Sequence, residues 1–307
     1  MIVNIILPIV MIMFMGYSSI KLNLISSEHI RALATFVIKI ALPAYILHSL
    51  GNKQLSDIWQ PVYMLAYGGG SILVFFIAFQ VFRRLFGHRL TPAVVMSMGA
   101  SMSNTGLIGS AILPLLMGSH AIVYLSLTII FESLILVTVV LFLAEAGLQS
   151  QAKPKDLMVK TFKNLLKNPL VIAIVMAMIC MTFDIRLPHI FDQALENIGK
   201  SASPLALFVI GGSLVGLGIK ALDLQVVLLV ISKVVLMPFT IFILFYLLPN
   251  VTKPMMQAGT LIAALPMPTL FGILGQIYGL EKHALTALML STVFGFIGIG
   301  CLIVLWW

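Results

Sequence analysis

Ionisable side chains stand inside long apolar runs of this sequence, where a charge needs the protein interior, a partner or water. Lys39, Glu132 and Lys233 are placed in this way, and an isolated charge in hydrocarbon costs a few kcal/mol or more. Glu132 is the only acid in the middle of such a run. We interpret it as a proton carrier or as the counter-ion of Lys39 or Lys233, and a static ion pair is an equal alternative. His48 is a candidate for solute contact; the alternative is a histidine at a helix end near the membrane surface.

Two clusters of helix-disfavouring residues interrupt apolar runs, one in each half of the chain. They consist of Ser103, Asn104, Thr105 and Gly106, and of Pro266, Pro268 and Thr269. Proline removes a backbone donor and clashes with the preceding turn, while Ser, Asn and Gly favour local alternatives to the helix. We therefore predict two broken helices, whose free N–H groups attract an anion and whose free carbonyls attract a cation. With His48, these residues form the predicted substrate site. A pair of proline kinks that only bend packed helices is the alternative.

Other kinds of chemistry are missing from the sequence. No G-x-x-x-x-G-K-[ST] segment is present to bind nucleotide phosphates, and neither acid pairs nor histidine clusters point to a hydrolase or a metalloenzyme. Cys180 and Cys301 lie in apolar runs without a second ligand at metal-binding spacing, which favours inert thiols. We therefore predict no enzyme activity, no catalytic residue, no metal and no cofactor.

The elements that must position these residues are apolar helices. Of the 307 residues, 61% are hydrophobic and 9% are charged, against about 25% charged residues in a soluble domain. Because roughly 20 apolar residues form one helical crossing of a bilayer, the sequence predicts an all-α integral membrane fold of ten transmembrane helices. The predicted spans are 2–20, 30–51, 58–82, 92–117, 121–144, 169–184, 195–219, 224–248, 255–279 and 284–306.

The net charge of +8 is a topology signal, because the basic residues stand in short loops without an aromatic-rich polar face for nucleic acid. Twelve lysines and arginines fall in the odd-numbered loops and three in the even-numbered ones. The positive-inside rule then makes the odd-numbered loops cytoplasmic and places both termini outside. We expect a multi-pass protein of the cytoplasmic (inner) membrane with no nucleic-acid partner.

An internal repeat divides the chain into residues 1–148 and 169–307, joined by a polar cytoplasmic segment at 149–168. That segment is a solvated linker or, alternatively, lies along the inner membrane surface. Pro43 matches Pro204 at an offset of 161 residues, and SNTGLIG matches PMPTLFG at an offset of 163. Each half holds five predicted spans, so the second half must enter the membrane from the opposite side. Inverted repeats of this kind are typical of secondary transporters that work by alternating access.

Five segments carry a resemblance to a known family. They are IALPAYILHSL, NTGLIGSAILPLL, IGKSASPLALFVIGGSL, SKVVLMPF and LIAALPMPTLFGILGQIYG. In this order, and over essentially the whole chain, they resemble the auxin efflux carrier family, which includes bacterial carriers of small carboxylates such as malonate. Ser103 stands where the plant branch has proline, and the long central loop of many plant carriers is missing. Both departures favour the bacterial carboxylate-carrier branch over a carrier of auxin itself.

The resemblance implies ten helices in two inverted five-helix repeats, with helices 4 and 9 broken and crossing at the substrate site. It places the breaks at Asn104–Gly106 and Pro266–Thr269, and it implies a scaffold part and a moving transport part. We therefore expect a secondary-active or facilitative transporter of a small organic anion, a mono- or dicarboxylate. The alternatives are a sodium-coupled symporter of the bile-acid type and a membrane receptor or scaffold without flux. The substrate, the direction, a coupling ion (H+ or Na+) and a homodimer stay open.

Overall fold

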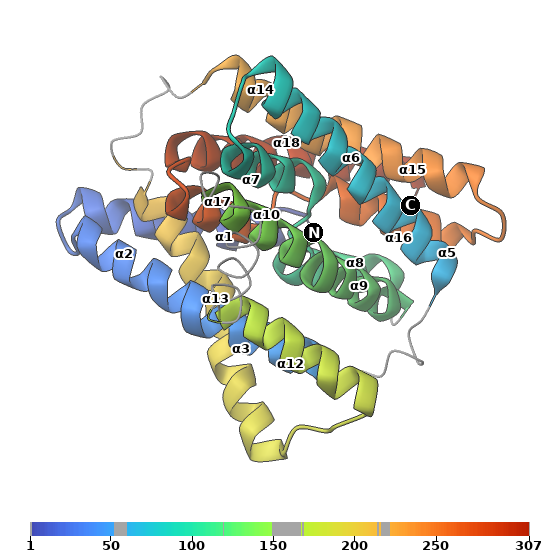
Figure 1. Cartoon of the computed structure of the whole chain (residues 1–307), viewed down its shortest axis with the longest axis horizontal. Coiled ribbons are helices and arrows are strands. Elements are labelled where there is room, and N and C mark those ends of the chain that lie inside the picture. Colours follow the sequence, from blue (N-terminus) through green and yellow to red (C-terminus); the bar gives the residue numbers. More distant parts are fainter. Residues whose placement is uncertain are drawn as a thin grey trace. The chain divides into compact units, whose positions relative to one another are not determined.

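The computed structural model describes residues 2–51, 60–118, 120–148, 167, 169–213, 215 and 222–306, and all regular structure in these ranges is helical (Figure 1). Six helices in the described ranges are long and apolar enough to cross a membrane: Ser27–His48, Pro61–Leu85, Val123–Leu148, Leu224–Leu247, Lys253–Ile277 and Glu281–Trp306. Two shorter apolar helices are Leu90–Ser101 and Val171–Phe183. This agrees with the predicted helical membrane fold, while the count of ten spans and the inverted repeat stay predictions. Apart from Lys167, the predicted linker 149–168 lies outside the described residues.

Contacts divide the chain into two compact units, and each unit takes segments from both halves of the sequence. Unit 1 contains Met1–Leu7, Gln60–Glu132 and Leu217–Trp307, and unit 2 contains Pro8–Trp59 and Ser133–Gly216. The long helix Val123–Leu148 passes from unit 1 to unit 2 directly after Glu132. The predicted division of the chain into two sequence repeats joined by the linker 149–168 is separate from these two units. It stays a prediction.

Unit 2 is a helical bundle whose helices approach closely at small residues. Its elements are α1 (Ile2–Lys21, from Pro8 onward), α2 (Ser27–Phe36), the π-helical turn η1 (Val37–Ala41), α3 (Leu42–Gly51), α10 (Thr138–Leu148), α12 (Pro169–Phe183) and α13 (His189–Ser213). Figure 1 shows α3 lying against α12 and α13. A side chain at Gly16 or Gly211 would collide with backbone of the facing helix, so glycine permits α1 and α13 to pack at this distance.

Unit 1 contains the two segments in which broken helices are predicted. Its elements are α5 (Pro61–Tyr63), η2 (Met64–Gly68), α6 (Gly69–Gln80), η3 (Val81–Leu85), α7 (Leu90–Ser101), η4 (Thr105–Gly109), α8 (Ser110–Met117), α9 (His120–Ile130), the first residues of η5 (Phe131–Val137), α14 (Leu224–Ile231), η7 (Ser232–Leu236), α15 (Met237–Leu247), α16 (Lys253–Ala264), α17 (Thr269–Ile277) and α18 (Glu281–Trp306). Within it, α15 packs on α6 and α16, and α18 packs on α14, α16 and α17.

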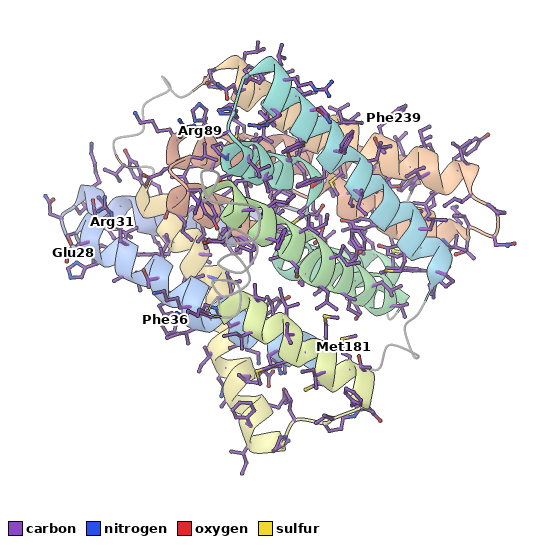
Figure 2. The ribbon with its side chains drawn as sticks, in the orientation of Figure 1. Glu28, Arg31, Phe36, Arg89, Met181 and Phe239 are labelled. Carbon is purple, nitrogen blue, oxygen red and sulfur yellow. The ribbon has the colours of Figure 1, made fainter. Side chains whose placement is uncertain are left out.

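Apolar side chains cover the outside of these helices, while several polar ones are buried. Phe239 is 62% exposed and points away from α15 (Figure 2). Glu132 and Lys233 are buried in unit 1. A soluble protein would place these residue types the other way round. The distribution is the one expected when lipid surrounds the helices.

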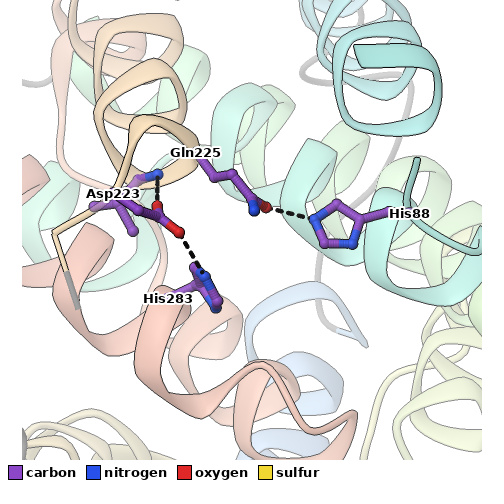
Figure 3. A network of polar contacts seen from close by, with 5 residues as sticks. His88, Asp223, Gln225 and His283 are labelled. Carbon is purple, nitrogen blue, oxygen red and sulfur yellow. Dashed lines mark hydrogen bonds and ion pairs between the residues drawn. The ribbon is translucent and has the colours of Figure 1, made fainter. Parts of the chain in front are cut away.

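A polar network fixes the beginning of α14 (Figure 3). Asp223 is the N-cap of α14: its Oδ1 accepts the backbone N–H of Val226 at 2.9 Å, and its Oδ2 lies 3.0 Å from Nε2 of His283 at the start of α18. Nearby, Nε2 of His88 lies 2.5 Å from Oε1 of Gln225. These contacts join the loop before α7, the start of α14 and the start of α18 within unit 1.

Candidate functional site

The first interruption lies between α7 and η4. The helix ends at Ser101, Met102 has extended dihedral angles (φ −119°, ψ 155°), and helical structure resumes at Thr105. The non-helical residues are therefore Met102, Ser103 and Asn104. They begin one residue before the predicted polar cluster and include its first two members.

The second interruption lies between α16 and α17. α16 ends at Ala264, and both Leu265 and Pro268 have extended backbone (ψ 152° and 145°) before α17 begins at Thr269. Pro266 and Pro268 have no N–H to continue the helical ladder. Pro266 and Pro268 of the predicted cluster lie in the interruption, whereas Thr269 is the first residue of α17.

α18 covers the second interruption. The hydroxyl of Ser291 accepts the backbone N–H of Met267 at 3.3 Å. A Cβ atom at Gly295 would lie 3.2 Å from the nitrogen of Pro266. Glycine at this position thus permits the irregular backbone to lie directly on α18.

The two interruptions are hydrogen-bonded to each other. The backbone N–H of Asn104 donates to the carbonyl oxygen of Pro266 at 2.9 Å. The carbonyl oxygen of Asn104 accepts from the N–H groups of Ile108 at 3.0 Å and Gly109 at 3.1 Å. Since a buried backbone group without a partner costs the free energy of a lost hydrogen bond, each interruption stabilises the other.

Glu132 binds the first interruption from η5. Its Oε1 accepts the backbone N–H of Ser103 and the hydroxyl of Tyr67, both at 2.9 Å, and its Oε2 accepts the hydroxyl of Thr105 at 3.0 Å. A carboxylate at this place acts as the cap of the helical segment that begins at Thr105, because the positive end of that segment attracts negative charge.

Lys233, in η7, connects the first interruption to the end of α16. Its fully buried Nζ donates to the hydroxyl of Ser103 at 2.7 Å, to the carbonyl oxygen of Ala263 at 2.8 Å and to the sulfur of Met237 at 2.9 Å. An ammonium group has three donors, so all of them are used. Ala263 lies in the last turn of α16, where a cation compensates the negative end of the helix.

Ser103 connects the two charged side chains. Its N–H donates to Glu132 and its hydroxyl accepts from Lys233. Among the ion pairs of the described residues, none joins Glu132 to Lys233 directly. Lys39, the other lysine proposed as a counter-ion, lies in η1 of unit 2 and is exposed there. Of these two lysines, Lys233 is the one that shares a hydrogen-bonded cluster with Glu132.

The remaining predicted site residues differ in their surroundings. The side chain of Asn104 is 7% exposed, and no described residue forms a hydrogen bond with its carboxamide. Thr269 is half-buried at the start of α17, which has no side-chain cap, and Gly106 lies inside η4. His48 lies in unit 2, where its Nδ1 is 2.8 Å from Oδ1 of Asp192. Its contact with a solute stays a prediction.

Tyr67 also belongs to the cluster, although no prediction from the sequence included it. Two tyrosines four residues apart in an apolar span have the spacing of ordinary core packing, so the sequence contains no separate signal for a hydrogen bond to Glu132. One shared feature appears only in the structure: Tyr67, Thr105, Glu132 and Lys233 all lie in π-helical turns. Such turns are frequent at functional sites.

Comparison with known proteins finds a family model and relatives that match nearly the whole chain. A family model described as "Membrane transport protein" matches residues 1–303. A protein of Rhizobium meliloti (strain 1021), named "Putative malonate transporter", is 23% identical over 291 residues, which cover 95% of this chain and 91% of the relative. "Uncharacterized transporter YfdV" of Escherichia coli (strain K12) is 25% identical over 300 residues, which cover 95% of this chain and 93% of the relative. The resemblance to auxin efflux carriers is thereby confirmed. The chain belongs to the membrane transport protein family.

Proposed function

We propose that the protein is a secondary-active or facilitative carrier that moves a small organic anion, a mono- or dicarboxylate such as malonate, by alternating access. The main support for this proposal is the hydrogen bond from the backbone N–H of Asn104 to the carbonyl oxygen of Pro266, because it joins two interrupted helices. Non-helical backbone at membrane depth is tolerated where protein or a water-filled cavity surrounds it, and carriers use such backbone to bind a solute near the midplane.

The groups left for a solute favour an anion. Lys233 uses its three donors on protein atoms, and Glu132 accepts three hydrogen bonds, so the cluster is balanced internally. No described residue forms a hydrogen bond with the carboxamide of Asn104, and α17 begins at Thr269 without a side-chain cap, so we assign both to hydrogen bonds with the solute. A helix N-terminus attracts negative charge. The relative named a malonate transporter supports a carboxylate.

The proposed architecture is that of two inverted five-helix repeats, residues 1–148 and 169–307, with a cytoplasmic linker at 149–168. Helix 4 corresponds to α7, η4 and α8, and helix 9 to α16 and α17. The interruptions at matching positions of the two halves support this arrangement. The excess of basic residues in the odd-numbered loops supports an inner-membrane protein with both termini outside.

The test uses purified full-length protein in vesicles of phosphatidylethanolamine and phosphatidylglycerol. We expect labelled malonate to exchange against internal malonate, and unlabelled carboxylates to compete where neutral malonamide does not. Asn104→Ala and Thr269→Val should each lower the apparent affinity by about tenfold, the loss of one hydrogen bond to a charged group. Thr292→Val is the matched control, because the Thr292 hydroxyl bonds to Leu288 of its own helix.

Two results would contradict parts of this proposal. If wild-type vesicles exchange no carboxylate, the protein is not this carrier, and a receptor or scaffold becomes the better interpretation. If exchange persists unchanged in both Asn104→Ala and Thr269→Val, the assigned binding site is wrong. Uptake that stops when sodium is replaced by choline would favour the sodium-coupled symporter.

A further inference from the structure

Two hydrogen bonds join the same pair of helical segments one turn apart. The hydroxyl of Tyr63 lies 2.7 Å from Oγ1 of Thr128, and the hydroxyl of Tyr67 donates to Glu132 at 2.9 Å. Residues four apart in a helix lie on one face, so these bonds are successive rungs between α5–η2 and α9–η5. The rings of Tyr63 and Tyr67 are nearly parallel, at 3°, with centroids 5.9 Å apart.

Glu132 does not need the Tyr63–Thr128 hydrogen bond, the outer of the two rungs, to fill its own hydrogen-bonding capacity. Tyr67, Ser103 and Thr105 already donate to both carboxylate oxygens. Tyr63 and Thr128 are completely buried, and a buried hydroxyl pair stabilises a protein little more than apolar residues of the same shape would. Phenylalanine and valine would therefore fill this space equally well. The hydroxyl groups suggest a role other than packing.

Two more polar side chains, Gln60 and Tyr124, lie beyond the Tyr63–Thr128 rung toward the beginning of the span. Gln60 directly precedes α5, and its buried Oε1 has no hydrogen-bond partner among the described residues. The ring of Tyr124 lies 5.2 Å from that of Tyr63. Gln60, Tyr63 and Tyr67 follow each other at helical spacing, as do Tyr124, Thr128 and Glu132. This column of polar groups extends about 10 Å along the helix axis, from the first residues of the span to Glu132.

We propose that the column formed by Gln60, Tyr124, the Tyr63–Thr128 pair and Tyr67 is the path by which a proton reaches Glu132, so that H+ is the coupling ion. This inference rests on the proposed carrier function. The path requires hydronium to reach the Gln60 end of the column, where the Gln60 amide oxygen accepts a hydrogen bond and the hydroxyl groups carry the proton onward. Each hydroxyl oxygen accepts a proton while its own proton passes to the next oxygen, and the hydroxyls then rotate back. Transfer from one rung to the next requires one bridging water, which can span about 5.5 Å with two hydrogen bonds.

Protonation of Glu132 acts on the helix interruption. The charged and polar groups that face its carboxyl group are Tyr67 from η2, Ser103 and Thr105 from the interruption, and Lys233 from η7 through Ser103. A neutral carboxyl group accepts weaker hydrogen bonds from Ser103 and Thr105 and no longer balances the charge of Lys233. The proton therefore loosens the contact that holds the first interruption, which couples proton entry to the proposed substrate site.

The experiment compares wild type with the double variant Tyr63→Phe/Thr128→Val, which removes the outer rung and leaves every contact of Glu132 in place. In vesicles of phosphatidylethanolamine and phosphatidylglycerol, net malonate uptake driven by a pH gradient should slow by about tenfold, a barrier increase of about 1.4 kcal/mol. Malonate homoexchange needs no net proton entry and should be unchanged. Tyr246→Phe, at an exposed position of α15, is the control variant.

A second measurement does not depend on transport. The infrared carbonyl band of protonated Glu132, assigned by its loss in Glu132→Gln, should appear after an acid jump and should appear about tenfold more slowly in the double variant. If wild type develops no such band, or if the double variant matches wild type in both band kinetics and net uptake, the proton path is wrong. Failure of wild type to exchange malonate contradicts the carrier function instead, and the infrared kinetics still decide the path.

Discussion

The hydroxyl group of Ser103 accepts a hydrogen bond from Lys233 at 2.7 Å, across 130 residues of sequence. The same serine donates its backbone N–H to Glu132. Ser103 lies in the first helix interruption and Lys233 also binds the carbonyl of Ala263 next to the second. These three hydrogen bonds thus join the two interrupted helices and both buried charges.

Ser103→Ala should destabilise the protein and impair transport. The change leaves one N–H of the Lys233 ammonium without its acceptor in a buried position, which costs about 1–3 kcal/mol, while the backbone contact with Glu132 persists. Thermal unfolding of the purified protein measures the loss. Ser97→Ala is the control, because among the described residues the buried Ser97 hydroxyl donates to the carbonyl of Ala93 in its own helix. Equal stability of the two variants would show that the Ser103–Lys233 bond contributes nothing.

Lys233→Met should lower the free energy of unfolding by about 3–5 kcal/mol, because Glu132 then carries a buried charge without a compensating cation. The double variant Lys233→Met/Glu132→Gln removes both charges and should recover a large part of this loss. A double-mutant cycle of unfolding free energies gives the coupling between the two sites. Additive effects in that cycle would mean that the two charges do not interact through Ser103.

Gly275→Ala should disrupt the packing of α17 on α18. A Cβ atom at Gly275 would collide with the Cβ atom of Ala284, and the two helices would have to separate. The reciprocal change Ala284→Gly makes room for the new methyl group, so the double variant should regain stability. Thermal unfolding of the two single variants and the double variant provides the measurement. Loss of stability that Ala284→Gly fails to restore would contradict the close approach of these helices.

Asp223→Ala and Asp223→Asn should have different effects on stability. Asparagine still accepts the N–H of Val226 as a helix cap, whereas alanine removes the cap and costs about 1 kcal/mol. Both variants weaken the contact with His283. The midpoint of thermal unfolding should be highest for wild type, lower for Asp223→Asn and lowest for Asp223→Ala. Equal midpoints for the two variants would show that the cap has no measurable effect.

The helical membrane class could be predicted because each residue of a lipid-facing helix contributes to the same apolar signal. The positions of the two interruptions could also be predicted, since Pro266 and Pro268 lack donors and the Ser103–Gly106 segment disfavours a continuous helix. Helix-disfavouring residues predict the end of a helix only to within a residue or two. This explains why the first interruption begins at Met102, outside the polar cluster.

The contacts within the site could not be predicted from the sequence in the same detail. Lys233 and Lys39 look alike in sequence, as single lysines in apolar runs, and the tertiary packing alone brings Lys233 to Ser103. The hydrogen bond of Tyr67 depends on the rotation of η2 relative to η5, which a π-helical turn changes. The pairing of His48 with Asp192 likewise joins two helices of unit 2 that are distant in the sequence.

An experimental structure of the protein with bound malonate is the decisive test of the proposed binding site at the two interruptions. We predict that the helices at Met102–Asn104 and Leu265–Pro268 are interrupted and in contact, and that a carboxylate of malonate lies within hydrogen-bonding distance of the Asn104 carboxamide and the start of α17. Two continuous helices at these positions, or malonate bound away from both interruptions, would contradict the account.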